Sequence, residues 1–234
     1  MGRSTTPPRP GEETAPATSA GWRPDGPAAT LVLVRHGRTA MTDAGAYSGA
    51  ADPGPDLTTA GHIEAARAAD AVARLGRDFL PDLPRAGTVV ASPLARTQQT
   101  AEAIGRRLGA HVRTDTDLVE AGFGSWDGLT AVEIDAHDPG GLRGWYAGDR
   151  PAPGGESVAD VGARVAPVLG RWAVPDATVV LVTHTIVIRA AVGLALDAPV
   201  HAWNRVRIAP GSLTVLRRWP GGPSEVVATS LLPR

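Results

Sequence analysis

The sequence predicts an α/β fold, a three-layer α/β/α sandwich with a mainly parallel central sheet. Three short apolar runs, at residues 31–34, 88–91 and 178–182, lack the alternation of half-exposed strands, so we expect strands buried on both faces. Segments with the 3.6-residue period of an amphipathic helix follow each run. Strands that alternate with helices favour a parallel sheet with helices on both sides.

The first 29 residues differ in composition from the rest of the chain. Residues 1–29 are rich in Pro, Thr, Ala and Gly, and Trp22 is their main large apolar residue. Such a stretch cannot bury enough surface to offset the entropy of ordering, so it predicts a flexible tail. The remaining residues, 30–234, fall within the usual size of one domain with a single core.

The first two long helices are expected after the first two strands. A helical pattern begins near Thr58 and runs through Ala73, with Ile63 along its apolar side. Ser92 and Pro93 follow the second strand. They predict a helix start, because a Ser oxygen caps a free N–H group and Pro is preorganised for the first helical turn.

The second half of the chain is expected to form a loop, a helix, a strand, another helix and two final strands. Residues 137–156 hold many Gly and Pro and predict a long irregular loop, of the kind that often carries binding residues. A helical period returns over residues 157–172 and again after the third apolar strand. Two strands are expected near residues 212–219 and 225–230, on either side of a Pro-Gly-Gly-Pro turn.

Charge and composition exclude several classes of function. The net charge of −1 and the pI near 6.6 predict neither a nucleic-acid surface nor an anionic-membrane surface. The chain has no cysteine, which excludes thiolate nucleophiles. No run approaches the ~20 apolar residues of a membrane helix, and no apolar segment follows the N-terminus, so a cytoplasmic location is expected. All 23 basic residues are Arg, so a phosphate site would need Arg, His and backbone N–H groups.

The ends of the three predicted strands carry polar and basic residues. Arg35 and His36 follow the first strand, Arg96 lies in the turn after the second, and His184 follows the third. Ligands of parallel sheets bind outside the carboxyl ends of the strands, so we expect these side chains to lie together. Arginine offers forked donors that match phosphate geometry. An unprotonated imidazole is a competent nucleophile near neutral pH, which makes His36 the candidate nucleophile.

The candidate proton donor is Glu120. It is flanked by apolar and glycine residues, with Phe123 and Trp126 close by in the sequence. Desolvation in such a setting raises the pKa of a carboxyl group toward the working pH of an acid catalyst. Neither HExxH nor HxH occurs in the sequence, so we expect no metal and no cofactor.

Five segments in this order resemble the histidine phosphatase superfamily, also called the phosphoglycerate mutase-like family. They are residues 31–39 (LVLVRHGRT), 92–101 (SPLARTQQTA), 118–128 (LVEAGFGSWDG), 154–157 (GGES) and 182–189 (VTHTIVIR). The resemblance implies that a phosphoryl group passes to His36 and then to water. It also implies that Arg35, Arg96 and His184 bind and stabilise this group. Glu120 would be the proton donor and later the base for water.

The resemblance also suggests further substrate contacts and a branch of the family. The backbone N–H of Thr185 would contact the phosphate, and Tyr47, Ser48 and Gly49 form a segment similar to the family's loop beside the substrate. Mutase-like members usually carry Asn where this chain has Thr42, so that contact is either replaced by the Thr42 hydroxyl or lost. The acid block around Glu120 is similar to the phosphatase branch, which includes α-ribazole and acid phosphatases.

We therefore expect a phosphomonoesterase that acts on a small phosphorylated metabolite. A phosphoglycerate mutase and a non-catalytic member that binds phospho-ligands stay open as alternatives. Trp145, Tyr146 and Arg150 are candidates for contacting the substrate. Because the chain lacks Lys, a site for a phosphoglycerate carboxylate would have to be rebuilt from Arg143 or Arg150. The oligomeric state also stays open, with a homodimer as one option.

Overall fold

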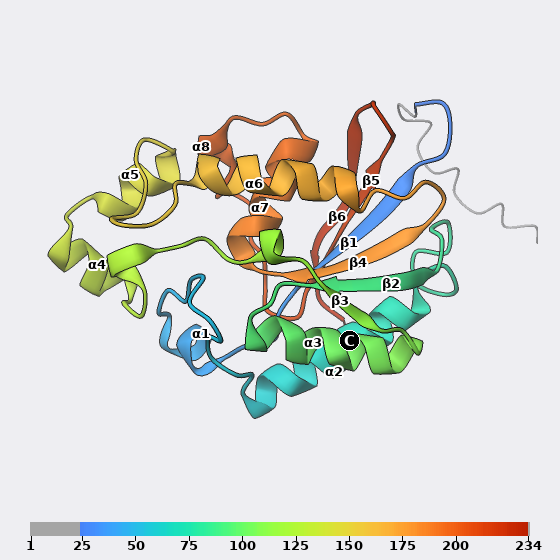
Figure 1. The fold of residues 1–234 in the computed structure, drawn as a ribbon, viewed down its shortest axis with the longest axis horizontal. Coiled ribbons are helices and arrows are strands. Elements are labelled where there is room, and N and C mark those ends of the chain that lie inside the picture. The colour runs from blue at the N-terminus through green and yellow to red at the C-terminus, as the bar shows by residue number, and fades with distance from the viewer. Residues whose placement is uncertain (1–23, 234) are drawn as a thin grey trace, which may run out of the picture.

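The computed structural model describes residues 24–233 as a six-stranded sheet between two layers of helices (Figure 1). The strand order is β3-β2-β4-β1-β5-β6. The strands are β1 (Ala29–Arg35), β2 (Ala86–Ala91), β3 (Val112–Thr114), β4 (Thr178–Thr183), β5 (Leu213–Arg218) and β6 (Ser224–Leu231). The first four are mutually parallel, and β5 and β6 are antiparallel to their neighbours. The expected three-layer, mainly parallel fold is confirmed.

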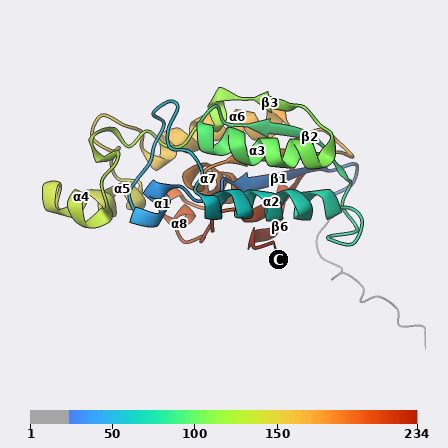
Figure 2. The same cartoon turned by 90° about the horizontal axis from the view of Figure 1, so that it is seen from below.

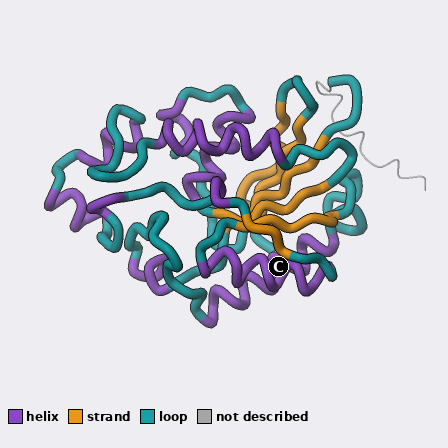
Figure 3. Tube along the Cα trace, in the orientation of Figure 1, coloured by secondary structure: helices purple, strands orange, loops and turns teal. Residues whose placement is uncertain are grey.

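The helices divide between the two faces of the sheet and the end where the parallel strands finish. The long helices are α2 (Thr59–Arg74), α3 (Ala95–Leu108), α6 (Val158–Arg171) and α7 (Thr185–Ala195). The short ones are α1 (Ala40–Ala44), α4 (Ala131–His137), α5 (Gly141–Ala147) and α8 (Val200–Trp203). Figure 2 shows α2 and α3 along one face, with the β1 arrow directed toward α1, α4 and α5. Figure 3 shows the strands gathered at the opposite end.

The pleat of β1 divides the core in two. Leu31 and Leu33 pack with buried residues of α6 and α7, whereas Val32 and Val34 face α2 and α3. All four side chains are almost completely buried. Helices that cover both faces explain why this strand is a continuous apolar run and shows no alternation.

The start of the ordered fold lies close to the predicted position. β1 begins at Ala29, one residue before the expected boundary, because Ala29 pairs with Arg218 of β5. The Trp219 indole N–H also donates to the Gly26 carbonyl. Residues 1–23, which make up most of the expected tail, lie outside the described residues. Among residues 24–233, no helix is long and apolar enough to cross a membrane.

Three local expectations were wrong, each for a physical reason. The segment 137–156 is not irregular throughout, because α5 forms inside it between Gly140 and Gly148, and both glycines have positive φ. Such glycines end helices as readily as they form loops. On α2 the buried face consists of small residues and Ile63 is 50% exposed. Ser92 does not cap α3, which begins at Ala95 without a side-chain cap.

Candidate active site

Backbone pairing links the ends of β1, β4 and β2 at one edge of the sheet. Arg35 is paired with Thr183 across β1 and β4. The His36 N–H donates to the Thr183 carbonyl at 3.1 Å, and the Ser92 N–H donates to the Val182 carbonyl at 3.0 Å. This register brings the residues after all three strands to one edge of the sheet, as the sequence predicts.

His36 is held in one orientation and one tautomer. Its Nδ1 lies 2.7 Å from the Gly37 carbonyl oxygen, which can only accept, so Nδ1 carries the hydrogen. The side chain is only 6% exposed. Burial lowers its pKa well below 6.5, and the positive charges of Arg35 and Arg96 lower this pKa further. His36 is therefore a neutral imidazole at neutral pH with a lone pair on Nε2.

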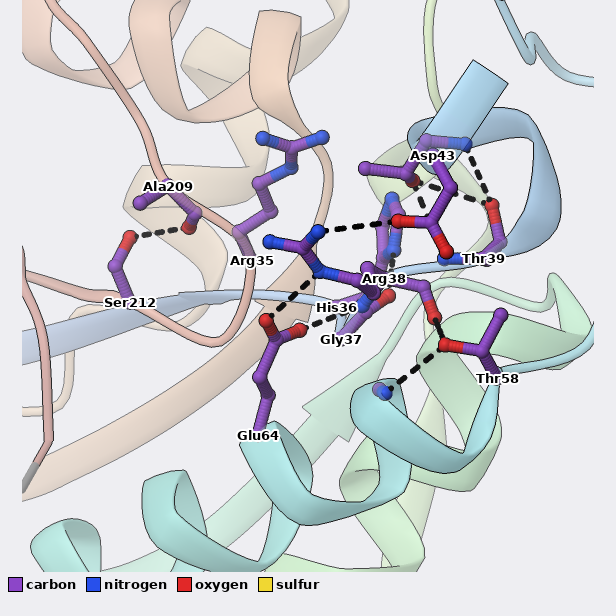
Figure 4. Close-up of polar contacts among 12 residues, drawn as sticks. Arg35, His36, Gly37, Arg38, Thr39, Asp43, Thr58, Glu64, Ala209 and Ser212 are labelled. Carbon is purple, nitrogen blue, oxygen red and sulfur yellow. Dashed lines mark hydrogen bonds and ion pairs between the residues drawn. The ribbon is translucent and has the colours of Figure 1, made fainter. Parts of the chain in front are cut away.

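The backbone after His36 lies directly against α2. The Gly37 N–H donates to the Thr100 hydroxyl at 3.2 Å, and a Cβ at Gly37 would collide with the Gly61 carbonyl. The Arg38 backbone N–H and Nε both donate to the Glu64 carboxylate, at 2.8 and 3.1 Å (Figure 4). These contacts fix the loop that carries the Gly37 carbonyl, the partner of His36.

His184 lies beside His36 and is completely buried. The two ring centroids are 5.1 Å apart, with the rings inclined by 60°. His184 Nε2 lies 2.8 Å from the Ser92 hydroxyl oxygen. Burial is the main cause that lowers the pKa of His184, with a further contribution from the charge of Arg96. Two neutral imidazoles thus occupy the edge of the sheet.

Two guanidinium groups lie near these histidines. Arg35 donates to the Ile208 carbonyl at 2.7 Å, and burial lowers its pKa to about 10, so it remains charged at neutral pH. Arg96 is 1% exposed and donates to the carbonyls of Ser48 and Gly49, at 3.1 and 3.0 Å. The expected substrate-binding residues Ser48 and Gly49 therefore contact Arg96 through their backbone.

Glu120 also belongs to this site. It lies in the segment between two short 3-10 turns, Thr116–Leu118 and Gly124–Trp126. Its carboxylate accepts the Ala121 N–H at 3.0 Å and the Ile186 N–H at 3.2 Å. The side chain is 5% exposed. Burial raises its pKa above 4.5 against the opposing effect of these hydrogen bonds and the nearby arginines. Glu120 thus keeps a proton to higher pH than an exposed carboxyl group.

A pocket of about 290 Å³ opens onto this edge. Its described wall includes six predicted site residues: Arg35, His36, Thr42, Ser48, Glu120 and Thr185. Arg96, His184 and Gly49 are buried outside that wall. Thr185 is the first residue of α7 and lines the pocket, so the positive N-terminal end of this helix, which suits an anion, faces the pocket.

Thr42 has a second task besides lining the pocket. It forms a reciprocal capping box with Thr39 at the start of α1. Its hydroxyl lies 3.1 Å from the Thr39 hydroxyl and accepts the Thr39 N–H at 3.3 Å. This hydroxyl therefore stabilises the start of α1.

Of the four candidate substrate contacts in the segment 137–156, one lines the pocket and three do not. Tyr146 lines the pocket, whereas Trp145 is completely buried in the core. Arg150 forms a forked ion pair with Asp138 at 2.6 and 3.2 Å, and Arg143 is exposed on α5. The segment 137–156, expected to carry binding residues, thus contributes one aromatic side chain to the described lining of the pocket.

Sequence reasoning missed two residues of this region. Ser92 was interpreted as a helix cap, but it contacts His184. Arg189 lines the pocket without having been assigned a role, whereas Tyr47 lines it next to Ser48, in the segment expected beside the substrate. Arg189 comes one helical turn after Thr185, and that spacing on a helix that begins at the site could have identified it.

The comparisons with known proteins agree with this geometry. The family model described as the histidine phosphatase superfamily (branch 1) matches residues 31–229. A bifunctional protein of Mycobacterium tuberculosis is 36% identical over 217 residues, which cover 91% of this chain and 57% of that protein. The chain thus spans little more than half the length of this relative.

Two further relatives carry enzymatic names. The glucosyl-3-phosphoglycerate phosphatase of M. tuberculosis is 35% identical over 184 residues, covering 74% of this chain and 78% of the relative. A structure of mycobacterial glucosyl-3-phosphoglycerate phosphatase with VO3 has a TM-score of 0.75 at 32% identity, covering 87% of this chain and 100% of that chain. A 2,3-bisphosphoglycerate-dependent phosphoglycerate mutase of Brucella anthropi is 35% identical over 179 residues, covering 72% of this chain and 81% of the mutase.

The mainly parallel sheet, with histidines and arginines at the carboxyl ends of its strands, is the fold of the phosphoglycerate mutase-like proteins. Within that class, this chain belongs to branch 1 of the histidine phosphatase superfamily.

Proposed function

We propose that this chain is a phosphomonoesterase that hydrolyses a small phosphorylated metabolite through a phosphohistidine on His36. The orientation of His36 is the observation that carries the proposal. Its Nδ1–H donates to the Gly37 carbonyl, so the lone pair of Nε2 is available to attack phosphorus. The phosphorus–oxygen bond to the alcohol breaks as the bond to Nε2 forms.

The charged groups around His36 suit this transfer. Arg35 and the N-terminus of α7 at Thr185 line the pocket and would bind the nonbridging phosphate oxygens. Arg96 and His184 do not line the pocket, but both act on His36. The charge of Arg96 lowers the pKa of His36, and the ring of His184 contacts the ring of His36. Preorganised donors of this kind supply most of the catalysis of phosphoryl transfer.

Glu120 fits the role of acid and base in the two steps. With its raised pKa it would give its proton to the leaving oxygen of the alcohol. The resulting carboxylate would then remove a proton from the water that attacks the phosphohistidine. That attack breaks the bond to Nε2, releases inorganic phosphate and restores both residues.

Hydrolysis is favoured over the mutase reaction by two features. The acid segment around Glu120 has the form of the phosphatase branch. The Thr42 hydroxyl, at the position of a mutase asparagine, is engaged in the capping box of α1. A silent ligand-binding member would have no need for a buried carboxyl group with a raised pKa beside its nucleophile.

The decisive experiment compares the wild type with H36A on an aryl phosphate in the presence of a chelator. We expect phosphate release by the wild type, a loss of at least about a thousandfold in H36A, and 32P on histidine after an acid-free quench. Persistent activity in H36A, or its loss with chelator, would contradict the mechanism. Dependence on a bisphosphoglycerate primer would instead establish a mutase.

A further inference from the structure

We propose that Arg189 makes this pocket selective for phosphomonoesters that carry a carboxylate on the alcohol part. The inference rests on the proposed function and concerns the region of the pocket beyond the phosphate. Among the described residues that line the pocket, Arg189 is the second arginine besides Arg35.

The position of Arg189 follows from the geometry of α7. Thr185 and Arg189 are four residues apart and both line the pocket, so they lie on the same face of the helix. A rise of 1.5 Å per residue places the Arg189 backbone about 6 Å beyond Thr185 along the axis. A phosphate bound at the N-terminus of α7 would leave Arg189 within reach of a group a few bonds away on the same substrate.

The hydrogen bonds of Arg189 leave its outer nitrogens available. Its Nε donates to the Val206 carbonyl at 2.9 Å, which anchors the guanidinium from one side. The two terminal nitrogens can then bind a carboxylate end-on with paired hydrogen bonds. The charge of Arg189 also contributes to lowering the pKa of Arg35, so the two cations repel each other across the pocket. An anionic group at Arg189 would relieve this repulsion.

The balance of charge favours a single additional negative charge. Among the described residues that line the pocket, Glu120 is the one acidic residue, and the proposed mechanism needs it protonated. A phosphate dianion would match Arg35 together with the positive end of α7 and nearby Arg96. The positive charge of Arg189 is then left without a negative partner. A carboxylate would neutralise this charge, whereas a second phosphate dianion would bring more negative charge than Arg189 can neutralise.

Tyr47 and Tyr146 supply another donor beside Arg189. Their hydroxyl oxygens are 2.8 Å apart, and burial raises the pKa of Tyr47, so the Tyr47 hydroxyl keeps its proton. One of the two hydrogens is used within the pair and the other is left for a ligand acceptor. The charge of Arg189 reaches Tyr47, which shows that these donors lie in the same part of the pocket.

Two other arginines are poorly placed for this task. Arg150 is committed to Asp138 by its forked ion pair, and Arg143 is exposed outside the described wall. Arg143 therefore offers a matched control, because its removal also takes one guanidinium from the chain without changing the pocket.

The test compares two substrates that differ in a single group. Phosphate release is measured from 3-phosphoglycerate and from glycerol 3-phosphate, in which CH2OH replaces the carboxylate. We expect the wild type to favour the carboxylate by about tenfold or more in kcat/KM, as for a hydrogen bond to a charged group. R189Q should bring this ratio close to one, mainly through KM, and R189K should give an intermediate ratio. R143Q should keep the wild-type ratio.

The possible results separate this inference from the proposed function. A wild-type ratio near one, or an unchanged ratio in R189Q, overturns the role of Arg189 even when aryl phosphate is hydrolysed. A preference for propane-1,3-diol bisphosphate over 3-phosphoglycerate assigns Arg189 to a second phosphate and overturns the carboxylate. A wild type that hydrolyses no phosphomonoester at all, aryl phosphate included, overturns the proposed function. The wild-type ratio needs no variant, so poor folding of R189Q leaves the inference testable.

Discussion

The Ser92 hydroxyl oxygen lies 2.8 Å from Nε2 of His184, although the two residues are 92 positions apart in the chain. β2 and β4 are neighbours in the sheet, and each residue directly follows its strand. The pair therefore joins two strand ends through side chains. It also fixes the ring of His184 against the ring of His36.

S92A should slow catalysis without unfolding the protein. The variant leaves the buried Nε2 of His184 without a partner, which costs about 1–3 kcal/mol of stability. We expect kcat for an aryl phosphate to fall about tenfold, since ~1.4 kcal/mol of lost positioning corresponds to that factor. S125A, at an exposed position, is the control and should match the wild type. A wild-type kcat in folded S92A would show that the hydroxyl does not position His184.

The pH dependence of hydrolysis should follow the two shifted groups. The lowered pKa of His36 keeps its imidazole neutral at pH values where an exposed histidine is protonated. On the acidic side of the pH–rate profile, activity should therefore fall only well below pH 6.5. The raised pKa of Glu120 moves the loss of its proton above 4.5, and activity falls as pH rises through it. An alkyl phosphate, whose leaving oxygen needs a proton, is the appropriate substrate.

The variant E120Q tests whether Glu120 causes the fall in activity on the alkaline side of the pH–rate profile. The amide does not titrate, so this fall in kcat/KM should vanish while the fall on the acidic side stays. The loss of activity should also be larger for the alkyl phosphate than for an aryl phosphate, because only the poor leaving group needs protonation. Equal slowing of both substrates, or an unchanged fall on the alkaline side, would count against Glu120.

The sequence predicted the sheet well because its central strands are covered on both faces. The apolar runs at β1, β2 and β4 leave little choice but a buried strand, and the residues after them must then share an edge. Arg35, His36 and His184 are brought together by this rule alone. The short elements, such as α5, escaped prediction because Gly140 and Gly148 signal a loop and a helix cap equally.

The parts of the site that were missed depend on contacts distant in sequence. A Ser-Pro pair after a strand predicts a helix cap, and only the position of β4 shows that Ser92 meets His184 instead. Tyr47 and Tyr146 are 99 residues apart, and their hydroxyl contact depends on how α5 packs against the loop that follows α1. Local patterns carry no information about such pairs.

G37A should damage both stability and activity. A Cβ at this position would collide with the Gly61 backbone of α2, and backbone cannot move as a flexible side chain can. We expect a loss of at least about 1–3 kcal/mol, as for overpacking in a core, and a large loss of kcat. Urea unfolding measures the first and aryl phosphate hydrolysis the second. G170A is the control, because open space surrounds that helical glycine and Ala should raise stability by about 0.5–1 kcal/mol.

Glu64 should act as a positioning residue for the nucleophile. Its carboxylate accepts hydrogen bonds from the backbone N–H and the Nε of Arg38, and Arg38 follows the Gly37 carbonyl that orients His36 (Figure 4). E64A removes both acceptors, so we expect kcat to fall about three- to tenfold with little change in KM, because small misplacements of a nucleophile are costly. E64Q keeps an acceptor for the backbone N–H and should restore most of kcat.

A control separates this effect from the loss of a surface ion pair. Arg38 also pairs with Asp43 at 3.1 Å, where both side chains are more than 40% exposed. D43A breaks that pair but leaves the backbone contact with Glu64, and exposed pairs contribute little, so its kcat should equal the wild-type value. Equal losses of kcat in E64Q and E64A would mean that the charge of Glu64, and not its hold on the Arg38 backbone, matters for the nucleophile.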